Sequence, residues 1–205
     1  MESALSSRRP GRPLSFNRDF ALRQAMLVFW RHGYETTSIA DLTAAMGITA
    51  PSLYAAFGDK KQLFLEAVRL YAGDPRAMAD GIDAAPSALE AARGLMTAAA
   101  RAYTGEDTPS GCLMASATAS GSAASADVQR VVADIRRSVR CSLQAKIDQD
   151  MQAGRLPPAT DAAALAGLVM AVMQGMSVLA RDGMERPALL GIAEASLQAW
   201  PGDAR

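Results

Sequence analysis

The stretch GITAPSLYAAFGDKKQLF, residues 47–64, decides how the chain is interpreted, because it predicts a short helix between two turns. Gly47 ends the preceding helix, and Thr49 can cap a new one. Pro51 is tolerated in the first turn of that helix, since its missing N–H would have no intrahelical partner there. Gly58 ends the helix after about two turns. Its first residues are nearly apolar, which raises the question of what such a helix recognises.

The residues before this stretch predict two more helices. Asn17 can cap the first helix, which Gly33 ends. The second begins near Ser38 and carries an apolar stripe that ends at Met46. Two short helices joined by a glycine turn and braced by a first helix are typical of a helix-turn-helix, although plain helical bundles also contain hairpins with a glycine turn. A fourth helix opens at Asp59, where DKKQ reads as a capping box.

Composition and periodicity predict an all-α protein. Half of the 205 residues are hydrophobic and only 5% are aromatic, and the apolar residues recur at three- and four-residue spacing. We expect a flexible basic arm at 1–16, a helix-turn-helix unit at 17–62 and a larger helical region at 63–205.

Charge is unevenly distributed along a chain whose formal net charge is zero. Residues 1–61 contain eight basic and five acidic residues, a balance of +3, and the remainder carries −3. A basic N-terminal third favours a polyanionic partner for that third.

The segment FWRHGYETTSIADLTAAMGITAPSLYAAFGDKKQLF, residues 29–64, resembles the N-terminal DNA-binding segment of TetR-type (TetR/AcrR) transcriptional regulators. The resemblance covers about residues 20–70, and a weaker one lies in the Gly111-Cys112-Leu113-Met114 run. It implies a recognition helix that enters the major groove with its N-terminus first. It also implies that residues 17–62 form the DNA-binding domain and that residues 63–205 form a helical ligand-binding and dimerisation domain. A homodimer would then bind a palindromic operator in double-stranded DNA.

The resemblance assigns DNA contacts to particular residues. Thr37, Tyr54 and Lys60 carry a hydroxyl, a phenol and an ammonium, which suit phosphate oxygens. Ala50, Pro51 and Ser52 occupy the base-reading positions, so small apolar groups should meet thymine methyls. The full predicted set is Thr37, Thr49, Ala50, Pro51, Ser52, Tyr54 and Lys60, together with Arg8, Arg9 and Arg12 of the arm.

The rest of the chain predicts a bundle of longer helices, at about 86–103, 126–153, 161–183 and 187–200. One face of the second of these helices should point inward. It is expected to consist of Val128, Val131, Ile135, Val139, Ser142 and Ile147. The third contains no charge over residues 162–180, just long enough to span a bilayer. Its Ala- and Gly-rich composition, with Gln174 and close flanking charges, favours a helix buried on all sides in a soluble bundle or dimer.

Ligand and dimer contacts are expected from this bundle. Flexible apolar side chains can line an adaptable pocket, and the candidates are Met96, Tyr103, Met114, Met170 and Met173. Small and apolar residues of the last two helices should form a four-helix interface across a two-fold axis. The candidates there are Gly167, Ala171, Gly175, Leu189, Ile192, Leu197 and Trp200.

The sequence contains no catalytic triad, phosphate loop or zinc spacing, so we expect neither an enzyme nor a metal or other required cofactor. The expected function is that of a cytoplasmic repressor, released by an unknown small-molecule effector in the C-terminal domain. One alternative keeps DNA binding but switches it by oxidation or by a soft metal at Cys112 or Cys141. Another class of function would be a helical interaction or membrane-associated protein without DNA binding.

Overall fold

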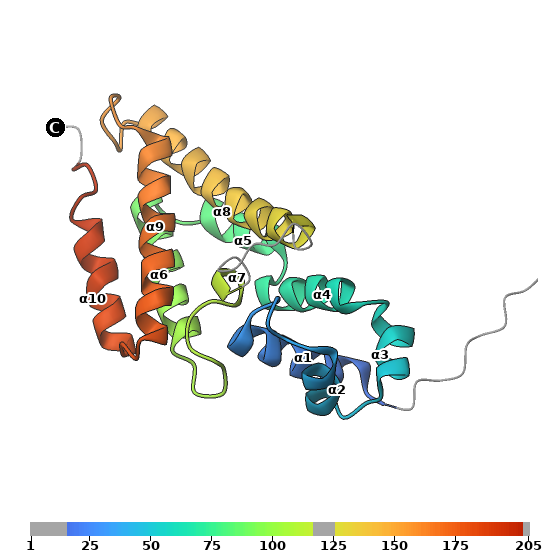
Figure 1. Ribbon diagram of the computed structural model, residues 1–205. Coiled ribbons are helices and arrows are strands. Elements are labelled where there is room, and N and C mark those ends of the chain that lie inside the picture. The colour runs from blue at the N-terminus through green and yellow to red at the C-terminus, as the bar shows by residue number, and fades with distance from the viewer. Residues whose placement is uncertain (1–15, 117–125, 203–205) are drawn as a thin grey trace, which may run out of the picture.

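The computed structural model describes residues 16–116 and 126–202, and all regular structure within these ranges is helical. The predicted contacts of Arg8, Arg9 and Arg12 lie outside the described residues. The described helices are α1 (Arg18–His32), α2 (Ile39–Met46), α3 (Ala50–Phe57), α4 (Lys60–Ala72), α5 (Pro75–Asp83), α6 (Ala88–Tyr103), α7 (Leu113–Ser116), α8 (Ala126–Gln152), α9 (Ala162–Arg181) and α10 (Arg186–Leu197) (Figure 1). The expected all-α class is confirmed.

The first four helices begin at the capping residues that the sequence predicts. The side chain of Asn17 accepts a hydrogen bond from the Phe20 N–H at 2.9 Å. Ser38 forms a complete capping box with Asp41 at the start of α2. Thr49 caps α3. These side chains satisfy backbone N–H groups that have no intrahelical partner.

An aromatic cluster fills the core of the N-terminal unit, which comprises α1 to α4. The rings of Phe29 and Phe64 meet edge to face with centroids 5.0 Å apart, and Tyr34 packs on Phe64 at the same distance. Leu42 and Leu53 are fully buried beside them. Burying each such side chain stabilises the fold by about 1.5–3 kcal/mol, and the packing fixes α2 and α3 against α1.

The C-terminal unit, α5 to α10, is a helical bundle in which α9 packs against α6, α8 and α10 (Figure 1). Helix α5 is not among the helices predicted from the sequence. Gly73-Asp74-Pro75 ends α4 and also starts α5. Asp74 accepts a hydrogen bond from the Arg76 N–H at 2.9 Å, and Pro75 occupies the first turn.

Helix α9 is partly buried within the protomer, and the predicted burial on all sides would be completed by a dimer partner. Among the described residues it is the one helix long and apolar enough to cross a membrane, and about a third of it is buried. It is not buried on all sides, because Leu168 and Val178 are 40% and 56% exposed. One face packs on the bundle, and the opposite face is an uncovered apolar strip.

Candidate DNA-binding surface and effector cavity

The exposed face of α3 carries the residues expected to read DNA. Leu53 and Phe57 point into the core, and Tyr54 between them is 48% exposed. Pro51 lies exposed in the first turn. The hydroxyl groups of Thr49 and Ser52 lie 2.9 Å apart. The first turn of α3 therefore offers two hydroxyls that hydrogen-bond to each other, beside small apolar groups. Their mutual hydrogen bond limits direct hydrogen bonding to bases.

The structure does not present the hydroxyl of Thr37 to DNA. Thr37 is only 1% exposed, and its Oγ1 donates to the Gly33 carbonyl at 2.6 Å. The hydroxyl links the end of α1 to the start of α2. The expected phosphate contact is thus not available to this side chain in the observed conformation, because the hydrogen bond and the burial hold it inward.

Lys60 is held at the start of α4 rather than freely solvated. Its ammonium donates to the Glu35 carbonyl at 3.3 Å and lies 4.7 Å from the centre of the Tyr34 ring. Burial lowers the pKa of Lys60, and the nearby Glu35 carboxylate opposes that shift. This arrangement positions a cation near the end of the recognition helix, where a phosphate contact remains a prediction.

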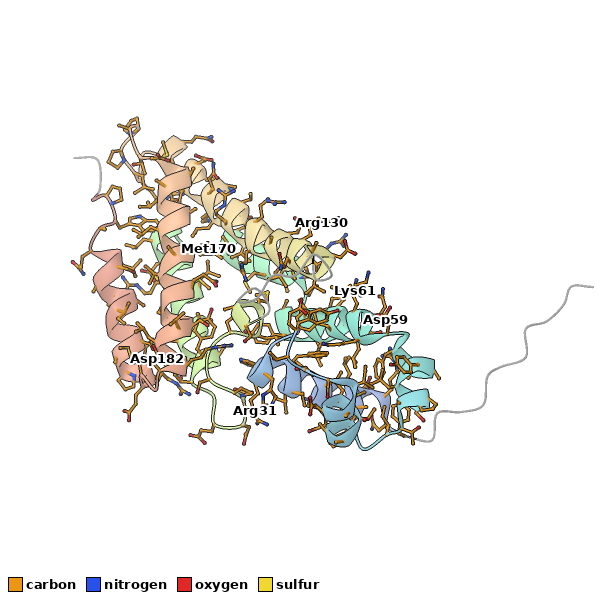
Figure 2. All side chains as sticks on the ribbon, viewed as in Figure 1. Arg31, Asp59, Lys61, Arg130, Met170 and Asp182 are labelled. Carbon is orange, nitrogen blue, oxygen red and sulfur yellow. The ribbon has the colours of Figure 1, made fainter. Side chains whose placement is uncertain are left out.

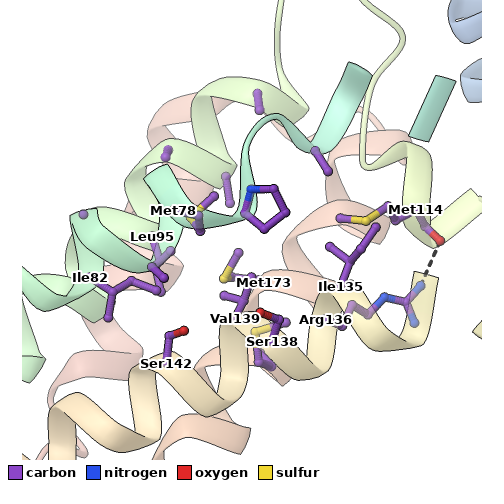
Figure 3. Close-up of a pocket in the computed structure, with 18 of the residues that line it drawn as sticks. Met78, Ile82, Leu95, Met114, Ile135, Arg136, Ser138, Val139, Ser142 and Met173 are labelled. Atoms are coloured by element: carbon purple, nitrogen blue, oxygen red, sulfur yellow. Dashed lines mark hydrogen bonds between the residues drawn. The ribbon is translucent and has the colours of Figure 1, made fainter. Parts of the chain in front are cut away.

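A cavity of about 930 Å³ lies between α5, α6, α8 and α9, with the end of α4 and α7 closing it (Figure 3). Tyr103, Met114, Met170 and Met173 line it, as expected of a ligand pocket. Met96 does not line it, because that side chain is fully buried in the core. The size is typical of small-molecule sites.

Several cavity residues were missed or were assigned to the core. These residues lie on α5 or on the inward side of α8. They are Met78, Ile82, Ile135, Arg136, Val139 and Ser142. Met78 and Ile82 are four residues apart, and they follow Pro75, a residue favoured in the first turn of a helix. Together these features would have indicated α5. The inward side of α8 was recognised, but packing and cavity lining have the same periodicity.

A polar group of residues lies at the α7 end of the cavity. The phenol of Tyr71 donates to the Cys112 sulfur at 3.4 Å. Burial raises the pKa of Tyr71 and of Tyr103, and the neighbouring Cys112 adds to both shifts. Both phenols therefore stay neutral near pH 7, and the single O–H of Tyr71 is already donated to Cys112.

The segment 111–116 joins this cavity to the N-terminal unit. Trp30, near the end of α1, donates from Nε1 to the Gly111 carbonyl at 3.1 Å. Ser116 donates back to the Trp30 carbonyl at 3.2 Å. The Cys112 N–H donates to Ser177 of α9 at 2.9 Å, and Arg181 donates to the carbonyl of Cys112 at 3.1 Å. One short segment thus contacts the cavity, α1 and α9 together.

A surface ion pair also crosses between the two units. Lys61 of α4 lies 3.1 Å from the carboxylate of Asp127 at the start of α8. Figure 2 shows both units with their side chains and labels Lys61. Because this pair is exposed, it contributes less to the connection than the buried hydrogen bonds of Trp30.

The predicted dimer contacts divide into two groups. Leu189 and Leu197 lie in the core of the protomer itself, so they are not available to a partner. Gly167, Ala171 and Gly175 lie at least partly accessible on α9, and Ile192 and Trp200 are half-buried on or after α10. Periodicity alone did not separate the inner face of α10 from its outer face.

The two cysteines differ in their environment. Cys112 is buried at the cavity, and Cys141 is exposed on α8. Within residues 16–116 and 126–202, no group of three or more His, Cys, Asp or Glu residues is placed to hold a metal ion.

Comparison with known proteins agrees with this architecture. Residues 21–67 match the model for bacterial regulatory proteins of the tetR family, and residues 88–188 match that of the tetracyclin repressor-like C-terminal domain. The HTH-type transcriptional repressor ComR of Escherichia coli K12 is 36% identical over 193 residues, which cover 93% of this chain and 92% of ComR. The HTH-type transcriptional repressor BdcR of the same organism is 41% identical over 73 residues, 36% of this chain and 37% of BdcR.

A solved structure extends the comparison to the whole fold. It is a cysteine mutant of CifR, a TetR family transcriptional regulator, in complex with a 26-base-pair operator DNA. It is 40% identical with a TM-score of 0.86, and the match covers 93% of this chain and 100% of that one. These relatives are transcriptional regulators, and none of the three is described as an enzyme. The chain belongs to the tetR family of bacterial regulatory proteins and is a DNA-binding transcriptional regulator with a helix-turn-helix at α2 and α3.

Proposed function

We propose that this regulator is a cytoplasmic repressor without catalytic activity, which binds a palindromic operator as a homodimer and is released by a small molecule in the cavity. The observation that carries the proposal is the double contact of segment 111–116. Cys112 and Met114 line the cavity, while Gly111 and Ser116 hydrogen-bond to Trp30 of α1. A ligand that displaces this segment acts directly on the helix that braces the DNA-binding unit.

Helix α4 gives a second connection between the two sites. It runs 13 residues from Lys60 to Ala72, about 20 Å at 1.5 Å per residue. Its first residue lies beside the helix-turn-helix, and Tyr71 near its end lines the cavity. The ring of Tyr71 also meets the Trp30 ring edge-on, with centroids 4.8 Å apart. A shift at the cavity therefore changes both α1 and α4.

Release requires the ligand to bind better to the arrangement that does not fit the operator. In a dimer, rotation of each DNA-binding unit changes the spacing of the two recognition helices, which must match the spacing of successive major grooves. The same coupling makes operator DNA weaken ligand binding by an equal factor.

Sequence preference should arise mostly from backbone placement and DNA shape. Ala50 and Pro51 offer no hydrogen-bond donor side chain, and Ser52 offers one hydroxyl that already pairs with Thr49. Small apolar groups suit thymine methyls. Tyr54 and Lys60 would anchor the unit on phosphates, and sequence-dependent deformation of the DNA would contribute the remainder.

The experiment is a footprint of the region upstream of the regulator's own gene, followed by a search for compounds that release it. We expect a symmetric protected site whose affinity falls steeply with salt. The variant Gly94→Leu serves to fill the cavity, because Gly94 lines it and a Cβ there meets nothing within 4 Å. It should bind the operator yet resist release. Release that is unchanged in this variant would contradict the cavity as the effector site.

A thiol switch at Cys112 is the second candidate, favoured by its place in the cavity beside Tyr71. Reaction at this sulfur would disturb the same segment that holds Trp30. Replacing Cys112 with Ser separates the candidates. A reversible small-molecule effector still releases the operator from Cys112→Ser, whereas a thiol switch is lost. Cys141→Ser is the matched control, because Cys141 is exposed and does not line the cavity.

A further inference from the structure

The cavity is chemically different at its two ends (Figure 3). Met78, Ile82 and Leu95 form an apolar end between α5 and α6. Arg136 lies at the opposite end, close to Met114. A ligand that fills the cavity therefore meets hydrocarbon on one side and a guanidinium on the other.

Arg136 has a hydrogen bond that connects it to segment 111–116. Its Nη2 donates to the Met114 carbonyl at 2.8 Å, and Met114 lies between Cys112 and Ser116, both of which take part in the contacts to α9 and α1. Arg136 also acts electrostatically on the phenol of Tyr103, lowering its pKa against the larger effect of burial. The guanidinium thus presents charged N–H donors to this end of the cavity, close to the neutral phenol of Tyr103.

The seam between α8 and α9 adds positive charge outside this end. A shallower groove of about 340 Å³ is lined by Arg136, Arg137 and Arg140, and it shares Arg136, Met170 and Gln174 with the cavity. Arg137 pairs with Asp134 at 2.6 Å. Arg140 donates to Gln144 and has no carboxylate within 4 Å in the described part of the chain. Cationic side chains at such an opening raise the local concentration of anions.

The acidic residues that line the cavity, Asp74, Glu90 and Asp134, each pair with a group other than Arg136. Glu90 pairs with Arg93, and Asp134 pairs with Arg137. Asp74 accepts from the backbone at the start of α5. All three residues are exposed, so water screens their charge.

We propose that the effector is an amphiphilic anion, with a carboxylate or phosphate monoester head bound by Arg136 and a single apolar tail that extends toward Met78 and Ile82. This rests on the proposed function of the cavity as the effector site. Oxyanions form paired, charge-assisted hydrogen bonds with a guanidinium. The head competes with the Met114 carbonyl for Arg136, and loss of that bond frees segment 111–116, which holds Trp30.

The test compares decanoate, decyl phosphate, decanol and decylammonium, each below its micelle concentration, by calorimetric titration of the full-length protein without DNA. We expect one or both anions to bind about tenfold to a hundredfold more tightly than decanol, and decylammonium to bind most weakly. The two anions distinguish a carboxylate head from a phosphate head. Equal affinity for the anions and decanol would overturn the proposal.

Substitutions test whether Arg136 is the residue that binds the anionic head. Arg136→Gln should reduce anion affinity to that of decanol while decanol binding persists, which shows that the cavity is intact. Arg136→Lys keeps the charge and should restore part of the preference. Arg130→Gln is the matched control, since Arg130 lies on α8, is 72% exposed and pairs with Asp127. An anion preference that survives in Arg136→Gln, or that Arg130→Gln removes equally, overturns the assignment.

Operator release is measured separately with the same compounds. If an anion binds through Arg136 without releasing the operator, the ligand class stands and the proposed effector mechanism fails. If the operator is released only by compounds that are not amphiphilic anions, the ligand class fails and the cavity mechanism stands.

Discussion

The two units of the molecule use their interior differently. The core of α1 to α4 is filled by large side chains such as Phe29 and Phe64, which are fully buried. The bundle of α5 to α10 surrounds a cavity of about 930 Å³. A filled core holds one geometry, as a surface that must match DNA requires. A hollow bundle can repack around a ligand, which provides the second arrangement that regulation needs.

The strongest test of this contrast is the loss of unfolding free energy on truncating one residue in each unit. Phe64→Ala should lower it by about 3–5 kcal/mol, because the cavity left in a packed core cannot collapse. Met78→Ala is the comparison on the cavity wall. Met78 is 40% exposed, so its loss should stay near or below about 1 kcal/mol. Denaturant unfolding measures both, and similar losses would refute the contrast.

The junction between the units should be the next most sensitive place. Gly111 has φ +81°, and a Cβ there would lie 2.6 Å from Nε of Arg181 and 2.8 Å from the Ser177 carbonyl. Gly111→Ala should cost about 2–5 kcal/mol from backbone strain and overlap together. Gly47→Ala is the control, since Gly47 has φ +66° and ψ +31°, in the left-handed helical region, with open space around it. It should cost about 1–2 kcal/mol, measured by thermal or denaturant unfolding.

Trp30→Phe should mainly weaken the coupling between effector binding and operator binding, with a smaller effect on the free energy of unfolding. It removes the donor to the Gly111 carbonyl and leaves that acceptor buried, at a cost of about 1–2 kcal/mol. The factor by which an effector lowers operator affinity should shrink severalfold, and this is read from operator titrations with and without ligand. Trp200→Phe makes the same chemical change at a half-buried site beyond α10 and should leave the coupling factor intact. An unchanged coupling factor in Trp30→Phe would rule out the segment 111–116 connection.

The smallest expected effects are those of substitutions on the DNA-binding surface, which change operator affinity or preference. Tyr54→Ala should weaken binding to all sequences by about tenfold or less, because it removes one phosphate hydrogen bond. Ser52→Ala should instead alter which operator variants are preferred. Fluorescence anisotropy on a panel of single-base operator variants separates the two outcomes. Unchanged preference in Ser52→Ala, with binding retained, would show that this hydroxyl does not read bases.

The N-terminal unit could be predicted closely because short-range chemistry determines it. Asn17, Ser38 and Thr49 act on N–H groups within three residues of themselves, so their effect is visible in the sequence. The side chain of Thr37 was misplaced for the opposite reason. A hydroxyl near a helix start suits both a phosphate and a nearby carbonyl, and only the fold shows that Gly33 accepts it.

Part of the cavity lining could be predicted, but its α5 and α8 walls could not, because an apolar stripe looks the same whether it faces side chains or empty space. On α8, Val128 and Ile147 are buried in the core, whereas Ile135 and Val139 between them line the cavity. Similarly, Leu189 and Ile192 of α10 were predicted to face the partner, but Leu189 is fully buried within the protomer. Deciding among core, cavity and interface requires the distances between helices, which depend on side chains far apart in the sequence.

The uncovered strip of α9 affects how much of the regulator stays folded in a cell. Leu168 and Val178 remain accessible in the single chain, and covering them with a second copy stabilises the folded form by mass action. The melting temperature should therefore rise with protein concentration. Copy number then sets both the occupancy of the operator and the lifetime of the protein, since a scarce protomer unfolds and is degraded more readily than an abundant one.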